Sequence, residues 1–214
     1  MQNKELIPLL CAGILFVIII ISVFSFNSHV PFISQTKSDV PVGEIYGEKK
    51  IGQTFFCDRD EMDRIDVLLA TYARINSGTI IFHLREKNEK TDIRTITFDA
   101  KYVRDTKYHQ FIFEPVENSK NTSYEFYLTS PDSSSGNAIT IWSTQENSYD
   151  GGDATINDRP INGDLNFKVF HTFDTSDFVS TFFWRLSQDI PFLIVYLVIV
   201  SILLLIILFV YTRK

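Results

Sequence analysis

The sequence predicts an antiparallel β-sandwich placed between two long apolar helices. Three observations support this fold class. Two uncharged apolar runs, Leu6 to Phe26 and Ile190 to Tyr211, bracket the chain. Between them, short runs of alternating apolar and polar residues recur, and clusters of Gly, Asn, Asp, Ser and Pro separate these runs. Alternation with turn clusters is typical of half-buried strands in an all-β domain.

The two apolar runs predict membrane-spanning helices at residues 1–26 and 190–214. A helix of about 20 residues is about 30 Å long, which matches the hydrocarbon core of a bilayer. For the first run a cleaved signal peptide is the alternative, although the apolar part of such a peptide usually holds only about 7–15 residues.

Positive charges at the ends of the chain predict its orientation. Lys4 precedes the first run, and Arg213 and Lys214 follow the second. Because basic residues favour the cytoplasmic side, we expect a cell-membrane protein with two spans, both termini cytoplasmic and residues 27–189 extracytoplasmic. The lipid bilayer is then the first expected partner.

The strand pattern is clearest where Ile80, Phe82 and Leu84 alternate with Ile81, His83 and Arg85. Similar runs recur at about 10–15 residue spacing, which favours two packed antiparallel sheets over α/β units. We expect the sandwich at residues 51–172, a linker at 27–50 and a short interfacial helical segment at 173–189. The alternative for residues 173–189 is a final strand and a linker in place of the helix.

Charge and cysteine content exclude some classes of protein. The chain of 214 residues holds 26 acidic and 20 basic residues, a formal net charge of −6. Nucleic-acid binding needs a basic stripe, so no nucleic-acid partner is expected. Cys11 lies in the first apolar run and Cys57 in the middle domain, so we expect no disulfide between them.

Several strings resemble a known kind of domain. They include Gly52-Gln53-Thr54-Phe55, Arg64 to Tyr72, Phe82 to Glu86, Tyr127 to Asp132, Gly136 to Trp142 and Gly163-Asp164-Leu165. The stretch is similar to the jelly-roll outer domains (galactose-binding-like or carbohydrate-binding-module-like) of microbial cell-envelope membrane proteins linked to glycan assembly. The resemblance implies a jelly-roll sandwich and a cell-envelope setting. It implies no reaction and transfers no functional residues.

No catalytic residues are predicted. The sequence lacks the Gly-x-Ser-x-Gly, His-Glu-x-x-His and Cys-x-x-Cys motifs, and its four histidines are isolated from one another. We therefore expect a protein that is not an enzyme.

Aromatic residues near polar ones suggest where a glycan would bind. An aromatic ring stacks on the apolar face of a sugar while polar neighbours fix its orientation. The ligand-binding candidates are Tyr72, Arg74, Arg85, Trp142 and Tyr149. Burial in the core is the competing explanation for each aromatic residue.

A loop rich in acidic residues offers a second kind of site. Asp150, Asp153 and Asp158 are candidate oxygen ligands for a structural calcium, the one cofactor considered. The same residues, with Asn and Gly beside them, are also the usual residues of tight turns, and the composition favours turns.

The leading functional expectation is a non-catalytic, membrane-anchored accessory or structural subunit of a cell-envelope complex. Phe178, Phe182 and Phe183 are the predicted contacts to a membrane-protein partner, because aromatics anchor many interfaces. The alternative is a carbohydrate-binding module displayed on the membrane surface, with a glycan as ligand.

Overall fold

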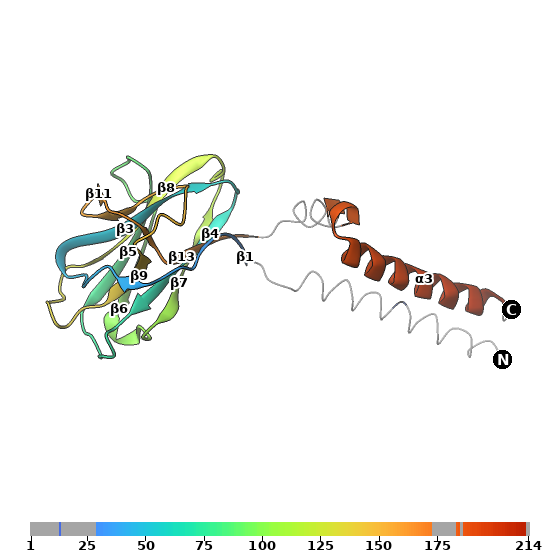
Figure 1. Ribbon diagram of the computed structural model, residues 1–214, viewed down its shortest axis with the longest axis horizontal. Coiled ribbons are helices and arrows are strands. Elements are labelled where there is room, and N and C mark those ends of the chain that lie inside the picture. Colours follow the sequence, from blue (N-terminus) through green and yellow to red (C-terminus); the bar gives the residue numbers. More distant parts are fainter. Residues whose placement is uncertain (1–12, 14–28, 173–182, 185, 213–214) are drawn as a thin grey trace. The chain divides into compact units, whose positions relative to one another are not determined.

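The computed structural model describes residues 13, 29–172, 183–184 and 186–212 (Figure 1). The chain divides into two units, of which one is His29–Thr172 and holds every strand found among the described residues. The second unit contains the helix α3 (Ile190–Thr212), whose side chains are described in part. Phe192 N–H donates to the Asp189 carboxylate at 3.1 Å, so Asp189 caps the start of α3.

The His29–Thr172 unit is an antiparallel sandwich of two sheets. The seven-stranded sheet contains β1 (His29–Gln35), β2 (Val40–Pro41), β4 (Met62–Ala70), β7 (Lys107–Val116), β9 (Thr140–Thr144), β12 (Asp164–Leu165) and β13 (Phe167–Thr172). Strand β4 lies at its centre, where it pairs with β7, β9 and β13.

The six-stranded sheet has the order β11 (Arg159–Pro160), β10 (Ala154–Ile156), β3 (Gly47–Cys57), β8 (Thr122–Ser130), β5 (Thr79–Glu86) and β6 (Arg94–Asp99). A single 3₁₀ turn, η2 (Ala100–Tyr102), follows β6 within the described chain. The chain passes repeatedly from one sheet to the other, for example from β3 to β4 and from β4 to β5.

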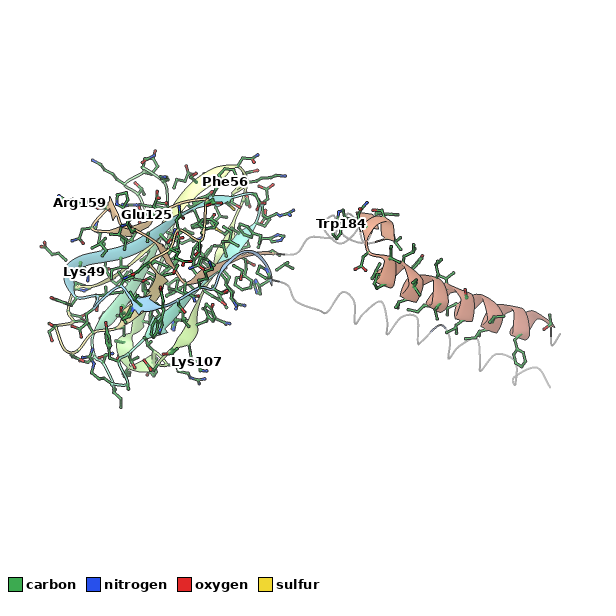
Figure 2. All side chains as sticks on the ribbon, in the orientation of Figure 1. Lys49, Phe56, Lys107, Glu125, Arg159 and Trp184 are labelled. Carbon is green, nitrogen blue, oxygen red and sulfur yellow. The ribbon has the colours of Figure 1, made fainter. Side chains whose placement is uncertain are left out.

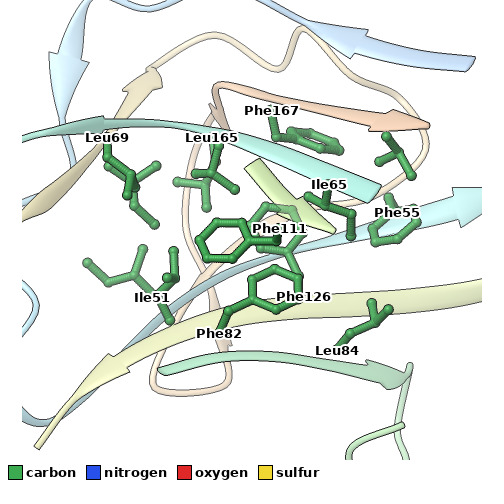
Figure 3. Packing of buried hydrophobic residues seen from close by; sticks show 14 of the residues in the cluster. Ile51, Phe55, Ile65, Leu69, Phe82, Leu84, Phe111, Phe126, Leu165 and Phe167 are labelled. Carbon is green, nitrogen blue, oxygen red and sulfur yellow. The ribbon is translucent and has the colours of Figure 1, made fainter. Parts of the chain in front are cut away.

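The core lies between the sheets and combines aromatic rings with aliphatic side chains (Figure 3). Phe82 of the six-stranded sheet stacks on Phe111 of the other sheet with ring centroids 4.2 Å apart, and Phe126 lies 6.1 Å from Phe82. The alternation predicted for β5 is confirmed, because Ile80, Phe82 and Leu84 are fully buried while the residues between them face outward.

The segment expected to be a linker, residues 27–50, contains strands instead. His29–Gln35 forms β1, an edge strand paired with β13, and Val40–Pro41 pairs with β9. Ile45 is fully buried in the core. These strands are set by pairing with residues more than 100 positions away, which local alternation does not reveal.

The predicted localisation needs correction. Among the residues that the structure describes, no helix is long and apolar enough to cross a membrane. Because a span requires about 20 consecutive apolar residues in one helix, this finding overturns the cell-membrane localisation with two spans and residues 27–189 outside. The transmembrane helices expected to flank the sandwich are likewise unsupported. The first run lies outside the described residues, apart from Gly13.

Candidate functional site

The outer face of the six-stranded sheet carries a row of polar side chains. Arg85 on β5 lies opposite Glu125 on β8, and Glu125 lies opposite Thr54 on β3. Since alternate residues of a strand share a face, these three side chains point away from the core together. The strand registers therefore assemble a polar site from three separate stretches of sequence.

A buried ion pair occupies the centre of this row. Arg85 Nε and Nη2 donate to Glu125 Oε2 at 2.9 and 2.6 Å, and Thr155 Oγ1 donates to Glu125 Oε1 at 3.2 Å. Only 6% of Glu125 is exposed. Both carboxylate oxygens are thus occupied by neighbours within the protein, which satisfies an otherwise costly buried charge.

The β10–β11 hairpin closes over the same row. Arg85 Nη2 also donates to Asp158 Oδ1 at 2.8 Å, and Lys50 Nζ lies 3.5 Å from Asp158 Oδ2. Burial opposes the charge on Arg85, but the hydrogen bonds and charge of Glu125 outweigh it, so the pKa of Arg85 is raised. Arg85 is therefore a permanent cation that joins the sheet to the hairpin.

A groove of about 370 Å³ lies above this ion pair. Its floor includes Thr54, Arg85, Glu125 and Thr155. One wall is the β5–β6 connection, residues 87–90, and the other is formed by Asp153, Asp158 and Pro160. Figure 2 labels Glu125 on β8 and Arg159 on β11.

The groove walls offer polar side chains that are not committed to other residues. Within the described chain, no hydrogen bond or ion pair involves the side chains of Lys87, Asn88, Glu89, Lys90 or Asp153. Among these side chains, the charges of two lysines balance those of Glu89 and Asp153. On the floor, the charges of Arg85 and Glu125 cancel. The groove therefore combines donors and acceptors with little net charge.

The far end of the 87–90 wall is fixed by contacts among Tyr127, His83 and Asp92. Tyr127 O–H donates to Asp92 Oδ1 at 3.1 Å, and His83 Nδ1 lies 2.8 Å from Asp92 Oδ2. The His83 and Tyr127 rings stack with centroids 4.3 Å apart. Burial, followed by the nearby Asp92 charge, raises the pKa of Tyr127 to about 12, so its hydroxyl remains a donor. These contacts fix where the wall rejoins the sheet.

Two predicted ligand-binding residues, Tyr72 and Arg74, lie in the turn between β4 and β5. Arg74 stacks over the Tyr72 ring at 4.9 Å, and its Nη2 donates to Glu44 at 2.6 Å and to the Ala138 carbonyl at 3.1 Å. Tyr72 has a positive φ of 57° and is 42% exposed. The guanidinium of Arg74 therefore fastens three loops together.

The structure does not bring the five predicted ligand-binding residues together. Arg85 is six residues beyond Thr79 along β5, or about 20 Å from the start of that strand and the turn before it. Trp142 is half-buried on β9. Tyr149 packs edge-on against Phe167 at 5.5 Å, and its hydroxyl accepts the Phe56 N–H at 3.2 Å. Only Arg85 lines the groove.

Of the predicted calcium ligands, Asp150 is exposed in a turn. Asp158 is paired with Arg85 and Lys50, while Asp153 lies on the groove wall. Asn157 and Asp158 adopt positive φ angles of 52° and 62° at the hairpin turn, as the turn explanation predicts. Among the described side chains, no group of three or more His, Cys, Asp or Glu residues is placed to hold a metal ion.

Of the predicted partner contacts, Phe178 and Phe182 lie outside the described residues. Phe183 is described, is 62% exposed and lies beside Trp184, which is equally exposed. Residues 183–184 and 186–188 are helical, within the segment for which the sequence predicts a helix.

Sequence reasoning missed most of the groove, including Thr54, Glu125 and the 87–90 wall. Glu125 resembles any outward-facing strand residue until the distant β10–β11 hairpin covers it. One signal was present: Arg85 and Glu125 both stand in the outward phase of strongly alternating strands.

Comparisons with known proteins leave the chain without an assigned family. A scan against protein-family models found no match, and a search of curated protein sequences also found none. The groove and its residues are therefore interpreted from their geometry.

Proposed function

We propose that the His29–Thr172 unit is a non-catalytic binding module of jelly-roll type, whose groove on the six-stranded sheet takes a neutral saccharide. The single observation that carries this proposal is the groove itself, with uncommitted donors and acceptors on both walls above a fully paired ionic floor. Binding sites of small molecules are generally concave, with a few convergent polar groups.

The balance of charge favours a neutral ligand. Arg85, Lys87 and Lys90 line the groove together with four carboxylates, and Lys50 reaches one of these, Asp158. A sugar hydroxyl both donates and accepts hydrogen bonds, so a neutral polyol suits a site that offers ammonium and amide donors together with carboxylate acceptors. A strongly anionic ligand would face the carboxylates of Glu89 and Asp153.

The ion pair favours binding over catalysis by Glu125 or Asp158. Glycoside hydrolysis needs two carboxyl groups free to exchange protons or attack the sugar. Glu125 is instead engaged by Arg85 and Thr155, and Asp158 by Arg85, which leaves only Glu89 and Asp153, on opposite walls, with free carboxylates. A rigid, paired floor orients wall groups without taking part in proton transfer.

The test is a glycan array probed with the full chain, its Lys90→Ala variant and its Lys107→Ala variant. Lys90 lies on the groove wall, whereas Lys107 is an exposed residue at the start of β7 in the other sheet. We expect the full chain and Lys107→Ala to retain the same neutral glycans and Lys90→Ala to bind them less. Equal binding by all three chains, or binding to no glycan, would refute the proposal.

A role as an accessory subunit remains a second proposal, favoured by the adjacent exposed aromatics Phe183 and Trp184. Exposed neighbouring aromatic residues are frequent anchors of protein interfaces. Replacing both with Ser should remove a stoichiometric partner from the purified complex, while unchanged stoichiometry would exclude this segment as the contact.

A further inference from the structure

Phe56 is an exposed aromatic ring on the same face of the sheet as the groove. It is the next outward residue after Thr54 on β3, and it is 43% exposed while its neighbours Phe55 and Cys57 are fully buried. Two residues along a strand correspond to about 7 Å. Figure 2 labels Phe56 and Glu125, which belong to the paired strands β3 and β8.

The residues beside Phe56 leave it partly exposed. Its cross-strand partner on β8 is the small Ser123, and the Ser123 carbonyl accepts the backbone N–H of Lys87 at 2.8 Å. The row Phe56, Ser123, Lys87 therefore runs beside the row Thr54, Glu125, Arg85. Tyr149 bonds only to the backbone N–H of Phe56, and within the described chain no aromatic ring stacks on Phe56.

We infer that Phe56 is an aromatic platform that extends the groove, so that the ligand is a saccharide chain of at least two pyranose units. One sugar occupies the groove and the next lies on the Phe56 ring. This inference rests on the proposed function and adds to it the size and shape of the ligand. It makes Phe56 a determinant of specificity for chains over single sugars.

The physical basis is the two-sided character of a pyranose ring. Its C–H groups stack on an aromatic face, while its hydroxyls lie at the rim and need polar partners. A sugar on Phe56 has Lys87 across the sheet on one side and the Thr54 row about 7 Å along β3 on the other. That distance is comparable with the width of one sugar ring, so neighbouring units of a chain can occupy both positions.

The experiment measures affinity against chain length by isothermal titration with the full chain. The probes are gluco-, manno- and galacto-oligosaccharides of one to six units. Phe56→Ala removes the platform and Phe56→Trp keeps one. Tyr102→Ala is the control, because Tyr102 is 69% exposed but lies in η2, which follows the edge strand β6. Circular dichroism verifies that each variant is folded.

For an oligosaccharide series that binds, we expect the affinity of the native chain and of Phe56→Trp to rise about tenfold between one sugar unit and two or three units. This rise is equivalent to about 1.4 kcal/mol. Phe56→Ala should lose this gain and keep its affinity for the single sugar. If Phe56→Ala retains the full gain, the platform is wrong and the groove proposal stands. If the native chain binds no saccharide in any series, both proposals fail.

Discussion

At the scale of single residues, Phe82 makes a direct side-chain contact between the two sheets. Its ring contacts Phe111 across the sandwich at 4.2 Å and lies within 6.4 Å of Phe113, and none of it is exposed. Removing such a ring leaves a cavity that rigid sheets on both sides cannot close.

Phe82→Ala should therefore lower the free energy of unfolding by about 3–5 kcal/mol. Urea denaturation of the full chain measures this loss. Ile112→Ala provides the comparison, because Ile112 is 55% exposed on β7 and such substitutions usually change stability by about 0.5 kcal/mol or less. A loss below about 1 kcal/mol for Phe82→Ala would contradict the packing described above.

Single residues differ in how much of their role the sequence alone predicts. The inward phase of Ile80, Phe82 and Leu84 follows from strict alternation, and the structure confirms it. The roles of Glu125 and Phe56 do not follow, because each depends on what lies beside or above its strand. Coverage by the β10–β11 hairpin buries Glu125, while Phe56 stays partly exposed, and this difference is set by contacts far apart in the sequence.

At the scale of secondary-structure elements, two glycines show the difference between a need for positive φ and a need for close packing. Gly136 and Gly163 both have positive φ angles, 82° and 85°. A Cβ at Gly136 would meet nothing within 4 Å, whereas a Cβ at Gly163 would collide with the carbonyl of Thr144 at the end of β9. Gly163 thus allows the chain entering β12 to pass close against β9.

Gly163→Ala should destabilise the protein by about 3 kcal/mol or more, and Gly136→Ala by only about 1 kcal/mol, the usual cost of the left-handed conformation. Thermal unfolding followed by circular dichroism compares the two. Equal shifts in melting temperature would show that the approach of β9 to Gly163 is not tightly constrained.

Elements differ in how well the sequence predicts them. Strand β5 carries its own alternation, and the sequence predicts it close to its observed position. Strand β1 contains Pro31 and has an irregular register with β13 between Pro31 and Ile33, so its sequence resembles a linker. Its pairing depends on strand β13, which closes the sandwich from the other end of the domain.

At the scale of the whole molecule, ionised carboxylates tie the connecting loops together. Backbone N–H donation from Gly136, followed by the hydrogen bond from Arg74, lowers the pKa of Glu44. Backbone N–H donation from Thr71 likewise lowers the pKa of Asp105. A carboxyl whose pKa is lowered by folding stabilises the protein above its unfolded pKa, and this stabilisation is lost as the pH falls through its folded value.

The free energy of unfolding should therefore decline as the pH falls below the ordinary values of these groups, 4.5 for Glu44 and 3.8 for Asp105. In urea titrations at pH 7 and pH 3, Glu44→Gln should lose less stability on acidification than the native chain. Glu117→Gln, at an exposed site between β7 and β8, should behave like the native chain. An unchanged pH dependence in Glu44→Gln would show that the Glu44 contacts are not linked to folding.

An NMR titration locates the ligand of the groove most directly. Amide signals of the isotope-labelled full chain are followed while a neutral oligosaccharide selected from the glycan array is added. We expect the largest shifts at Thr54, Thr155 and residues 87–90, with little change at Tyr72 and Arg74 in the distant β4–β5 turn. Shifts centred on Tyr72 and Arg74, with the groove signals unmoved, would contradict it.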